Sequence, residues 1–414
     1  MVVQPDHSTF RSYLLFFGGQ MVSLLGSSIA QFVVILWVTM TTGSAFLTSM
    51  AAFAGLVPMV LLMPVAGVLV DRAERRRFIA IVDFIQALTT VMLILAFWTN
   101  LVSIYVVLAL IGLRGVCQAF HLPAVSSIVP AMVPKDKLSR MNGLNFVLFG
   151  AVQLVAPAMA AVLLLFASID QILWLDPITF LVALVALLTI RIPRVNADKP
   201  KGSFRKDFAE GLSFIIHKEG LVPLSMLATA LNFLLSPLSA LMSYFVIYDH
   251  LGDASVLALV LISLQGGLLV GGLMMSVLKD IKRKVTMSLV FVFAVFMGYV
   301  VVALTPVGSY WLLAAAVAAM GFAVAPANVL INTVIQTIVP LDMLGRVDSV
   351  SSSISSAASP IGFLLSGAIV GFIGTGNLFL ACAIAGMVTV VVSLLFTNVA
   401  SLDQPPQQTE AKGT

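Results

Sequence analysis

Charged side chains are scarce in this sequence. It contains 22 Lys and Arg and 18 Asp and Glu among 414 residues, or 10% charged residues, whereas soluble globular proteins average about 25%. The chain therefore lacks the polar surface to face water on all sides, which excludes an ordinary soluble globular protein. A hydrophobic share of 60% and a mean hydropathy of +1.10 indicate that lipid surrounds most of it.

Cysteine and several catalytic motifs are also lacking. Cys117 and Cys382 both lie in apolar segments, so we expect neither a disulfide framework nor a metal site. No G-x-x-x-x-G-K-[ST] loop occurs, which argues against an ATP-driven pump. No cluster of His, Asp and Glu has the spacing of a metal or nucleophile site, so we expect no enzyme and no cofactor. The net charge of +4 gives little support for nucleic-acid binding, and we expect no nucleic acid as a partner.

Long apolar runs are abundant. A helix needs about 20 mostly apolar residues to cross the hydrocarbon core of a membrane. Twelve segments satisfy this requirement: 12–40, 46–70, 78–98, 102–131, 139–167, 171–190, 219–248, 254–278, 285–304, 309–338, 345–373 and 376–398. The first is too long for the apolar region of a cleavable signal peptide. The sequence thus predicts an all-α integral membrane protein with twelve transmembrane helices.

One separator between these segments is long. Residues 191–218 begin as a polar stretch with two prolines and then become amphipathic, with Phe204, Phe208, Leu212 and Ile215 at helical spacing. We expect a short helix lying at the membrane interface; a merely solvated linker is the alternative. The predicted division is an N-terminal six-helix bundle (1–191), a cytoplasmic linker (192–218), a C-terminal six-helix bundle (219–400) and a polar tail (401–414).

Lys and Arg are concentrated in alternate loops. They cluster within 72–77, 135–140 and 279–284, whereas the opposite set of loops contains none. Because cytoplasmic loops carry the excess of Lys and Arg, both termini are predicted to lie in the cytoplasm. We expect a monomeric, multi-pass protein of the cell membrane, in contact with membrane lipid.

The two halves of the chain repeat. "VPKDKLSRMNG", from Val133, and "VPLDMLGRVDS", from Val339, share Val, Pro, Asp, Leu and Arg in register. "LPA" at 122–124 is echoed by "APA" at 325–327, with an offset of about one helical turn. These matches lie near corresponding junctions of the predicted spans, so they predict two pseudo-symmetric bundles. Parallel repeats of this kind are the arrangement of major facilitator transporters.

A charged stretch between the second and third apolar segments resembles a known sequence signature. "GVLVDRAERRR", from Gly67 to Arg77, resembles the G-x-x-x-D-R-x-G-R-R signature of the major facilitator superfamily, with Glu74 at a position that is usually Gly. Within that superfamily the whole chain resembles the macrolide-efflux branch of drug:proton antiporters. The supporting strings are "GQMVSLLGSSIAQF", "RGVCQAFHLPA", "LDPITFLVAL" and "LGRV".

The resemblance implies a function. It implies secondary active export of amphiphilic small molecules, drug or macrolide-like, by proton antiport and alternating access. Siderophore exporters and lysophospholipid transporters resemble the same branch and stay open as alternatives. A membrane sensor that no longer transports is a third reading, but a sensor needs a large soluble output module, and the longest predicted loop is the 191–218 segment.

The charged stretch is predicted to act as a conformational latch. An anion beside a helix N-terminus is stabilised by roughly 0.3–1 kcal/mol. The resemblance implies that Asp71 lies beside the start of the eleventh span and that Arg72 and Arg75 pair with Asp71 or neighbouring acids. The predicted latch comprises Gly67, Asp71, Arg72, Arg75, Gly345 and Arg346. The alternative is that the arginines only anchor the topology.

Four predicted spans carry polar residues on one helical face. These residues are Gln20, Ser27 and Gln31 in the first span, Arg114, Gln118 and His121 in the fourth, Asn232, Ser236 and Ser239 in the seventh, and Asn328, Asn332 and Gln336 in the tenth. In the resembled fold these four spans line the central cavity. The substrate-cavity candidates are therefore Gln20, Ser27, Gln31, Gln118, Asn232, Ser236, Asn328, Asn332 and Gln336. Hydrogen bonding between packed helices is the alternative.

Arg114 lies deep in an apolar span, about 18 Å from its start at a rise of about 1.5 Å per residue. It must face a cavity or meet an acid, and only Asp83 and Asp176 lie beyond the first turn of any predicted span. Pro177 loosens the backbone hydrogen bonds beside Asp176. Arg114 also matches an arginine to which the resembled family assigns proton transfer. The proton-coupling candidates are Arg114, Asp176, Asp83 and His121.

Two further motifs concern helix packing. Resembled antiporters carry G-P-x-x-G-G in the fifth span, where this chain reads "APAMAA" and retains Pro157. The sequence "QGGLLVGG", at 265–272, has the small-residue spacing of Gly267 and Gly271. Alanine is small enough to allow close helix contact at the first motif, and we interpret the second as a packing motif and not as a substrate site.

Overall fold

A computed structural model describes residues 7–403, except 73, 100–101, 135–136, 191–203, 279–280 and 341–342. The chain forms two compact units. Unit 1 comprises Met1–Lys199, Ala240–Ile262 and Ser366–Gly371, and unit 2 comprises Pro200–Ser239, Ser263–Leu365 and Phe372–Thr414. The division of the chain into two six-helix bundles with a separate linker stays a prediction.

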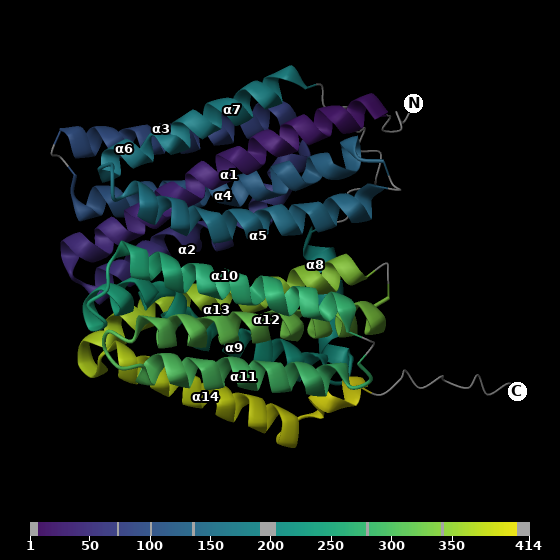
Figure 1. The fold of residues 1–414 in the computed structure, drawn as a ribbon. Coiled ribbons are helices and arrows are strands. Elements are labelled where there is room, and N and C mark those ends of the chain that lie inside the picture. The colour runs from purple at the N-terminus through teal and green to yellow at the C-terminus, as the bar shows by residue number, and fades with distance from the viewer. Residues whose placement is uncertain are drawn as a thin grey trace, which may run out of the picture. The chain divides into compact units, whose positions relative to one another are not determined.

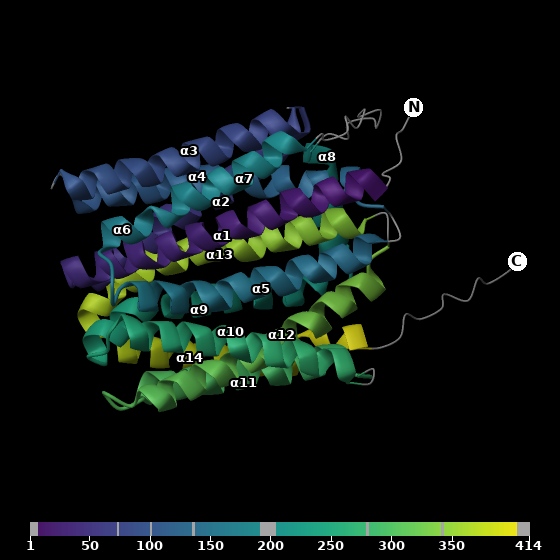
Figure 2. The same ribbon diagram turned by 45° about the horizontal axis from the view of Figure 1, so that its top comes forward.

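Unit 1 contains seven helices from the first part of the chain. They are α1 (His7–Thr42), α2 (Ala45–Arg72), α3 (Arg75–Trp98), α4 (Ile104–Met132), α5 (Leu138–Leu163), α6 (Ile169–Leu173) and α7 (Leu175–Thr189). Helix α1 lies between α7 and α5 and contacts both, while α3 contacts α4 and α7 (Figure 1 and Figure 2). Large apolar side chains, including Tyr13, Ile79 and Met132, are buried where these helices meet. Unit 1 thus encloses its own apolar core.

The remaining helices follow the long linker. They are α8 (Phe204–His217), α9 (Leu221–Tyr244), the π-helical η2 (Phe245–Asp249), α10 (Ala254–Val277), α11 (Lys284–Leu304), α12 (Tyr310–Ile338), α13 (Leu344–Ile373), α14 (Thr375–Phe396) and the 3-10 helix η3 (Asn398–Asp403). In unit 2, α11 packs against α12 and α14. The rings of Phe296, Tyr299 and Phe379 contact one another at tilted angles between α11 and α14.

The end of α9, η2 and the start of α10 belong to unit 1. There the hydroxyl of Ser243 lies 3.0 Å from that of Thr39 on α1, and Tyr248 donates a hydrogen bond of 3.0 Å to the carbonyl of Met40. On α13, Ser366 lies 3.4 Å from Ser49 of α2. These hydroxyl contacts hold the late segments against the ends of α1 and α2.

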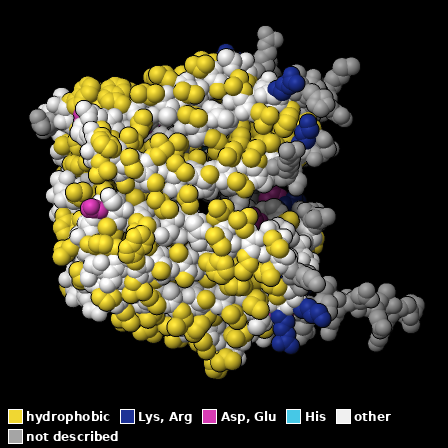
Figure 3. Space-filling view, viewed as in Figure 1, with side chains coloured by type: hydrophobic (Ala, Val, Ile, Leu, Met, Phe, Trp, Pro, Cys, Tyr) yellow, Lys and Arg dark blue, Asp and Glu magenta, His cyan; other side chains and the backbone are white. Residues whose placement is uncertain are grey.

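The prediction of twelve apolar spans is confirmed. Among the described residues, 12 helices are long and apolar enough to cross a membrane, and the described chain is helical without strands. Apolar side chains spread over the drawn face of each unit, and the Lys and Arg side chains in view lie near helix ends (Figure 3). Such a surface requires a lipid solvent.

The sixth predicted span differs from a continuous helix. It breaks at Trp174 into α6 and α7, because Pro177 has no N–H to donate to the carbonyl of Leu173 and lies within the first turn of α7, where that N–H is not needed. The effect of Pro177 is therefore larger than the local loosening that we expected. It fixes the place where α7 begins.

The predicted amphipathic helix is present as α8, with Phe208 and Leu212 half-buried and Ile215 buried. A side chain at Gly211 would lie 2.8 Å from the carbonyl oxygen of Arg346, so α8 packs directly on the first turn of α13. The described part of the linker, from Phe204 onward, thus belongs to unit 2.

The beginning of the predicted polar tail is also folded. Residues up to Asp403 form η3, and residues 404–414 lie outside the described part. The carboxylate of Asp403 accepts hydrogen bonds from the backbone amides of Val285 at 2.7 Å and Thr286 at 2.9 Å. Asp403 thereby satisfies amide groups that the first turn of α11 leaves unpaired.

Candidate functional site: a polar column within unit 1

Three neighbouring helices of unit 1 place polar side chains at one-turn intervals on the faces that meet. These side chains are Gln20, Ser23 and Ser27 on α1, Asp83, Gln86 and Thr90 on α3, and Arg114, Gln118 and His121 on α4. Since α4 runs antiparallel to the other two, these residues meet at three levels, which we call the polar column. The first level is Gln20, Asp83 and His121, the second is Ser23, Gln86 and Gln118, and the third is Ser27, Thr90 and Arg114.

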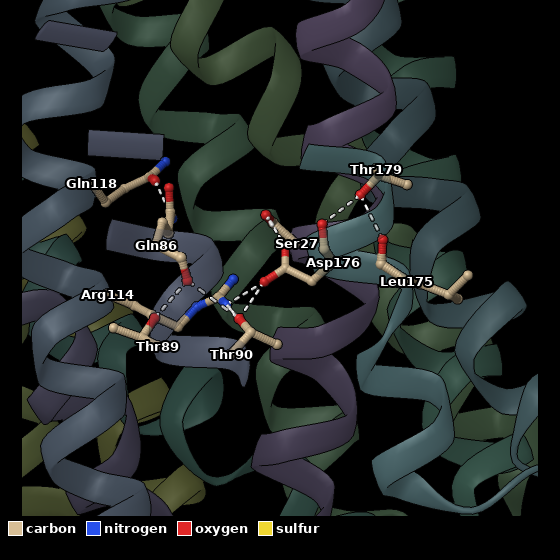
Figure 4. A network of polar contacts seen from close by, with 9 residues as sticks. All are labelled: Ser27, Gln86, Thr89, Thr90, Arg114, Gln118, Leu175, Asp176 and Thr179. Carbon is tan, nitrogen blue, oxygen red and sulfur yellow. Dashed lines mark hydrogen bonds and ion pairs between the residues drawn. The ribbon is translucent and has the colours of Figure 1, made fainter. Parts of the chain in front are cut away.

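The third level contains a buried ion pair. Arg114 Nη1 lies 2.5 Å from Oδ2 of Asp176 on α7, and Asp176 is only 3% exposed. Ser27 donates a hydrogen bond of 2.6 Å to Asp176 Oδ1, and Thr90 donates to Oδ2. Figure 4 shows the side chains of Ser27, Thr90 and Arg114 converging on the carboxylate of Asp176. Arg114 thus meets an acid, as its depth in the span required.

Local backbone features position this carboxylate. Asp176 lies in the first turn of α7, where the free amide groups and the helix dipole favour an anion. On the opposing helix, a side chain at Gly26 would lie 2.0 Å from Thr179 Oγ1. Only glycine therefore lets α1 approach α7 closely enough for the adjacent Ser27 to reach Asp176.

The first level contains a second acid with a histidine partner. His121 Nε2 lies 3.0 Å from Asp83 Oδ1, and Gln20 donates to Asp83 Oδ2 at 3.4 Å. Gln20 Oε1 also lies 3.2 Å from His121 Nε2. Asp83 is 6% exposed, and the buried Nδ1 of His121 makes no hydrogen bond within the described chain. Asp83 and His121, which are 38 positions apart, were named separately from the sequence and form one cluster here.

The second level connects the other two. Gln86 donates a hydrogen bond of 3.2 Å to Gln118 (Figure 4). Beside it lies a small cavity of about 10 Å³, lined by Ser23, Ser27, Asp83, Gln86 and Asp176 among others. Both buried carboxylates therefore border one polar cavity. Sequence reasoning missed Ser23, Gln86 and Thr90, although their spacing from Gln20 and Asp83 follows the same helical period.

The other predicted cavity residues divide into two groups. Gln31 on α1, Asn232 on α9, and Asn328, Asn332 and Gln336 on α12 are exposed. Ser236 is 3% exposed and donates to the carbonyls of Asn232 and Phe233 in its own helix. Ser236 therefore makes its hydrogen bonds within α9, and its role as a cavity residue stays a prediction.

The predicted latch is only partly described. The side chains of Gly67, Asp71 and Arg72 lie outside the described part of the structure, so the contact of Asp71 with Gly345 stays a prediction. Arg75 donates to the carbonyl of Ser127 at 3.0 Å and so joins α3 to α4.

Arg346 has partners that sequence reasoning missed. Its Nε lies 2.9 Å from Asp207 and its Nη1 lies 2.5 Å from Glu210, both on α8. The spacing of these two acids on an amphipathic helix was the available signal. Gly345, next to Arg346, is exposed.

Unit 2 also contains an apolar groove of about 530 Å³. Helices α8, α9 and α13 line it, with side chains that include Ile216, Met226, Phe233, Ile354 and Ile361. Ile216, Met226 and Ile361 are each more than half exposed. The groove is therefore wide, open and almost wholly apolar.

Twelve apolar helices describe a multi-pass membrane protein. The chain belongs to the Major Facilitator Superfamily, whose profile matches residues 16–347 and 224–414. Its relatives are transporters, so the chain is a multi-pass membrane transporter and not an enzyme.

Curated relatives include efflux proteins. Macrolide efflux protein A of Streptococcus pyogenes is 28% identical over 390 residues, which are 93% of this chain and 96% of that protein. The multidrug efflux pump Tap of Mycobacterium tuberculosis is 27% identical over 376 residues, which are 88% of each chain. Both similarities span most of the chain, so they support the resemblance that the motifs indicated.

Solved structures show the same fold. A D-xylose-proton symporter is similar with a TM-score of 0.68 at 13% identity, over 94% of this chain and 99% of that one. A bacterial homolog of the human lysosomal transporter Spinster, in an inward-facing and unoccupied conformation, has a TM-score of 0.66 at 17% identity, over 96% of this chain and 98% of that one. At these identities the likeness concerns the fold alone.

Proposed function

We propose that this protein exports amphiphilic small molecules, of the macrolide or multidrug type, in exchange for protons and by alternating access. The efflux relatives support the substrate class. The observation that carries the proton coupling is the buried ion pair of Arg114 and Asp176, because a charge pair at membrane depth is costly and marks a functional site.

The ion pair provides a way to couple a proton to a conformational change. Protonation of Asp176 removes the countercharge of Arg114 and leaves a cation buried among apolar helices, which is strongly unfavourable. The protein then favours whichever conformation exposes or re-pairs that cation. A coupling ion acts only through such a difference between two states.

Exposed polar residues on apolar helices are the proposed substrate contacts. Amphiphile sites combine apolar walls with a few polar groups that set orientation. The exposed residues Gln31, Asn232, Asn328, Asn332 and Gln336 satisfy that description, since each projects from a long and mostly apolar helix. Gln20, Ser27 and Gln118 belong instead to the polar column, so we assign them to coupling.

The proposal also covers the oligomeric state, the topology and the latch. It is a monomer in the cell membrane with both termini in the cytoplasm, as the distribution of Lys and Arg requires. Gly67, Asp71, Arg72 and Arg75 latch to the segment around Gly345 and Arg346 in the conformation that is closed toward the cytoplasm.

Transport in everted membrane vesicles tests this proposal. Radiolabelled erythromycin should accumulate when the lumen is acidic and leave when an uncoupler is added. Asp176→Asn should abolish gradient-driven uptake yet retain erythromycin binding and downhill exchange, with Asp83→Asn measured separately. Uptake that is indifferent to the uncoupler would exclude proton antiport.

A lipid substrate is the second candidate, and the apolar groove of unit 2 favours it. The groove lies beside the amphipathic α8, which is where an acyl chain from the adjacent leaflet would enter. Competition distinguishes the two substrates: a lysophospholipid that is itself transported, and that erythromycin fails to displace, would support the lipid function.

A further inference from the structure

We propose that the apolar groove of unit 2 binds one acyl chain of an anionic glycerophospholipid, which stays bound and fastens α8 to α9 and α13. This inference goes beyond the proposed export, because the bound lipid is not carried across the membrane. None of the exposed polar residues that we assign to the substrate lines the groove. The groove is therefore a site of its own.

The length of the groove matches one acyl chain. On α9 its wall runs from Val222 to Phe233, which is about 16 Å at a rise of about 1.5 Å per residue. One leaflet contributes half of a hydrocarbon core that is about 30 Å thick, so an acyl chain that crosses it spans about 15 Å. A chain that enters beside α8 therefore fills the groove and ends near the middle of the membrane.

The walls of the groove suit a ligand without polar groups. Ile216 of α8, Met226 of α9 and Ile361 of α13 stand on its three sides. The hydroxyl of Thr229, which also lines the groove, donates a hydrogen bond of 2.8 Å to the carbonyl of Ser225 in its own helix. A ligand here gains affinity in proportion to the methylene groups that it buries. An acyl chain does so and leaves no polar group without a hydrogen bond.

The groove begins at the membrane interface, where the amphipathic α8 is predicted to lie. Ile216 and Met226 are 59% and 69% exposed there, so apolar area faces a region that water reaches. An acyl chain that covers both side chains removes this area from water, which is favourable. Because the chain contacts α8 and α9 together, it holds the linker helix against the membrane-spanning helices.

Lys218 provides a charge for the lipid headgroup. It is exposed and directly follows α8, four positions before the groove begins on α9. Both acids of α8 are held by Arg346, and the neighbouring Glu219 accepts a hydrogen bond of 3.1 Å from Asn398. The positive charge of Lys218 therefore favours an anionic headgroup beside the groove.

The two longest stretches outside the described part do not suit the groove. Residues 191–203 and 404–414 consist mainly of polar, charged and proline residues. Their transfer into an apolar groove leaves polar groups without hydrogen bonds, which is costly. The surrounding bilayer, in contrast, supplies acyl chains in excess. A membrane lipid is therefore the occupant that the chemistry of the groove favours.

Native mass spectrometry tests the acyl-chain site. The purified protein is stripped of lipid in detergent and titrated with phosphatidylglycerol, and the affinity for the first bound lipid is compared between variants. Ala230→Phe fills the groove, because Ala230 lines it. Affinity should fall at least about tenfold, the effect of losing about two buried methylene groups. Ala294→Phe is the matched control, since Ala294 is exposed on α11 and does not line the groove, and it should bind like the wild-type protein.

Lys218→Ala tests the headgroup without filling the groove. The affinity for phosphatidylglycerol should fall about fivefold, the contribution of one lysine near an anionic lipid surface, whereas the affinity for phosphatidylcholine should stay the same. Lys282→Ala is the matched control, because it removes an exposed lysine from the loop between α10 and α11. It should leave both affinities unchanged.

The results separate this site from transport. Equal affinity of the wild-type protein and Ala230→Phe would overturn the acyl-chain site, and equal affinity of Lys218→Ala would overturn the anionic headgroup. Displacement of phosphatidylglycerol by erythromycin would make the groove a substrate site and would also overturn the proposal. Unfolding at the wild-type temperature without added lipid excludes misfolding of Ala230→Phe; if it is misfolded, Lys218→Ala decides alone. Export of erythromycin or lysophospholipid is judged by its own experiment, whose failure leaves these affinities unchanged.

Discussion

Arg346 Nε at the start of α13 lies 2.9 Å from Asp207 Oδ1 on α8. Together with the contact to Glu210, this pair ties the linker helix to the first turn of a membrane-spanning helix. Because Arg346 corresponds in the repeat to Arg140, the second copy of the repeated motif has a partner on the segment that connects the two halves. A movement of α13 therefore acts on the linker directly.

Reversal of this charge should loosen α8. Arg346→Glu places an anion beside Asp207 and Glu210, so we expect faster tryptic cleavage at Lys206 and reduced transport. The groups are about 40% exposed, so the lost stability should be no more than about 1 kcal/mol. Limited proteolysis measures the effect. Arg346→Lys keeps the charge and serves as the control, and equal cleavage of the two variants would refute a role for the ion pair.

Loss of one member of the buried ion pair should be more harmful than loss of both. Arg114→Gln leaves Asp176 as an unpaired buried anion, and we expect a loss of about 3–5 kcal/mol in stability. The double variant Arg114→Gln with Asp176→Asn should recover most of that stability but not proton-driven transport. Thermal unfolding in detergent provides the measurement, and additive losses in the double variant would contradict this expectation.

Two neighbouring glycines of α10 provide a test of helix packing. A side chain at Gly271 would lie 2.2 Å from the carbonyl oxygen of Phe322 on α12, whereas one at Gly272 would meet nothing within 4 Å. Gly271→Ala should therefore cost about 1–3 kcal/mol of stability. Gly272→Ala should be neutral or stabilising, because alanine favours the helix. Similar unfolding temperatures for the two variants would contradict the contact.

Cysteine labelling tests the topology. Val307 is 62% exposed between α11 and α12, and Val307→Cys in a background without Cys117 and Cys382 should react with an impermeant reagent from outside intact cells. Glu74→Cys should react only after the membrane is opened. Val307 is preferable to Gly308, whose φ of +81° strains any other residue. The reverse labelling pattern would place the termini outside.

The acid of the charged stretch is expected to matter for transport and not for folding. Asp71→Asn should insert and unfold like the wild-type protein but export erythromycin more slowly, because topology alone gives no reason for an acid at that position. Initial export rates, normalised to the amount of protein in the membrane, decide the matter. Export at the wild-type rate by this variant would contradict the proposed latch.

Helix positions were predictable from the sequence because the membrane imposes a length and a polarity on each span. The structure begins and ends most helices within a few residues of the predicted bounds. The break at Trp174 was harder to predict from the sequence, because the apolar run continues through it and only Pro177 signals a new helix. The fold of η3 was missed because a polar composition gives no sign that Asp403 has amide partners in α11.

The site was predictable as a set of residues but not as an arrangement. Depth in a span was enough to single out Arg114, Asp176, Asp83 and His121. Which acid meets which base depends on how α1, α3, α4 and α7 pack, and helical spacing alone does not contain that information. The cavity beside Gln86 depends in addition on Gly26, whose missing side chain brings α1 close to α7.

The carboxylate that caps α11 has a consequence for the order of assembly. Asp403 is synthesised more than a hundred residues after the amides that it binds, since the bond to Val285 spans 118 positions. Helix α11 must therefore enter the membrane with its first turn still hydrated, and three further helices are made before that turn is completed. A ribosome that stops ahead of Asp403 leaves behind a chain whose spans are all present but whose assembly is unfinished.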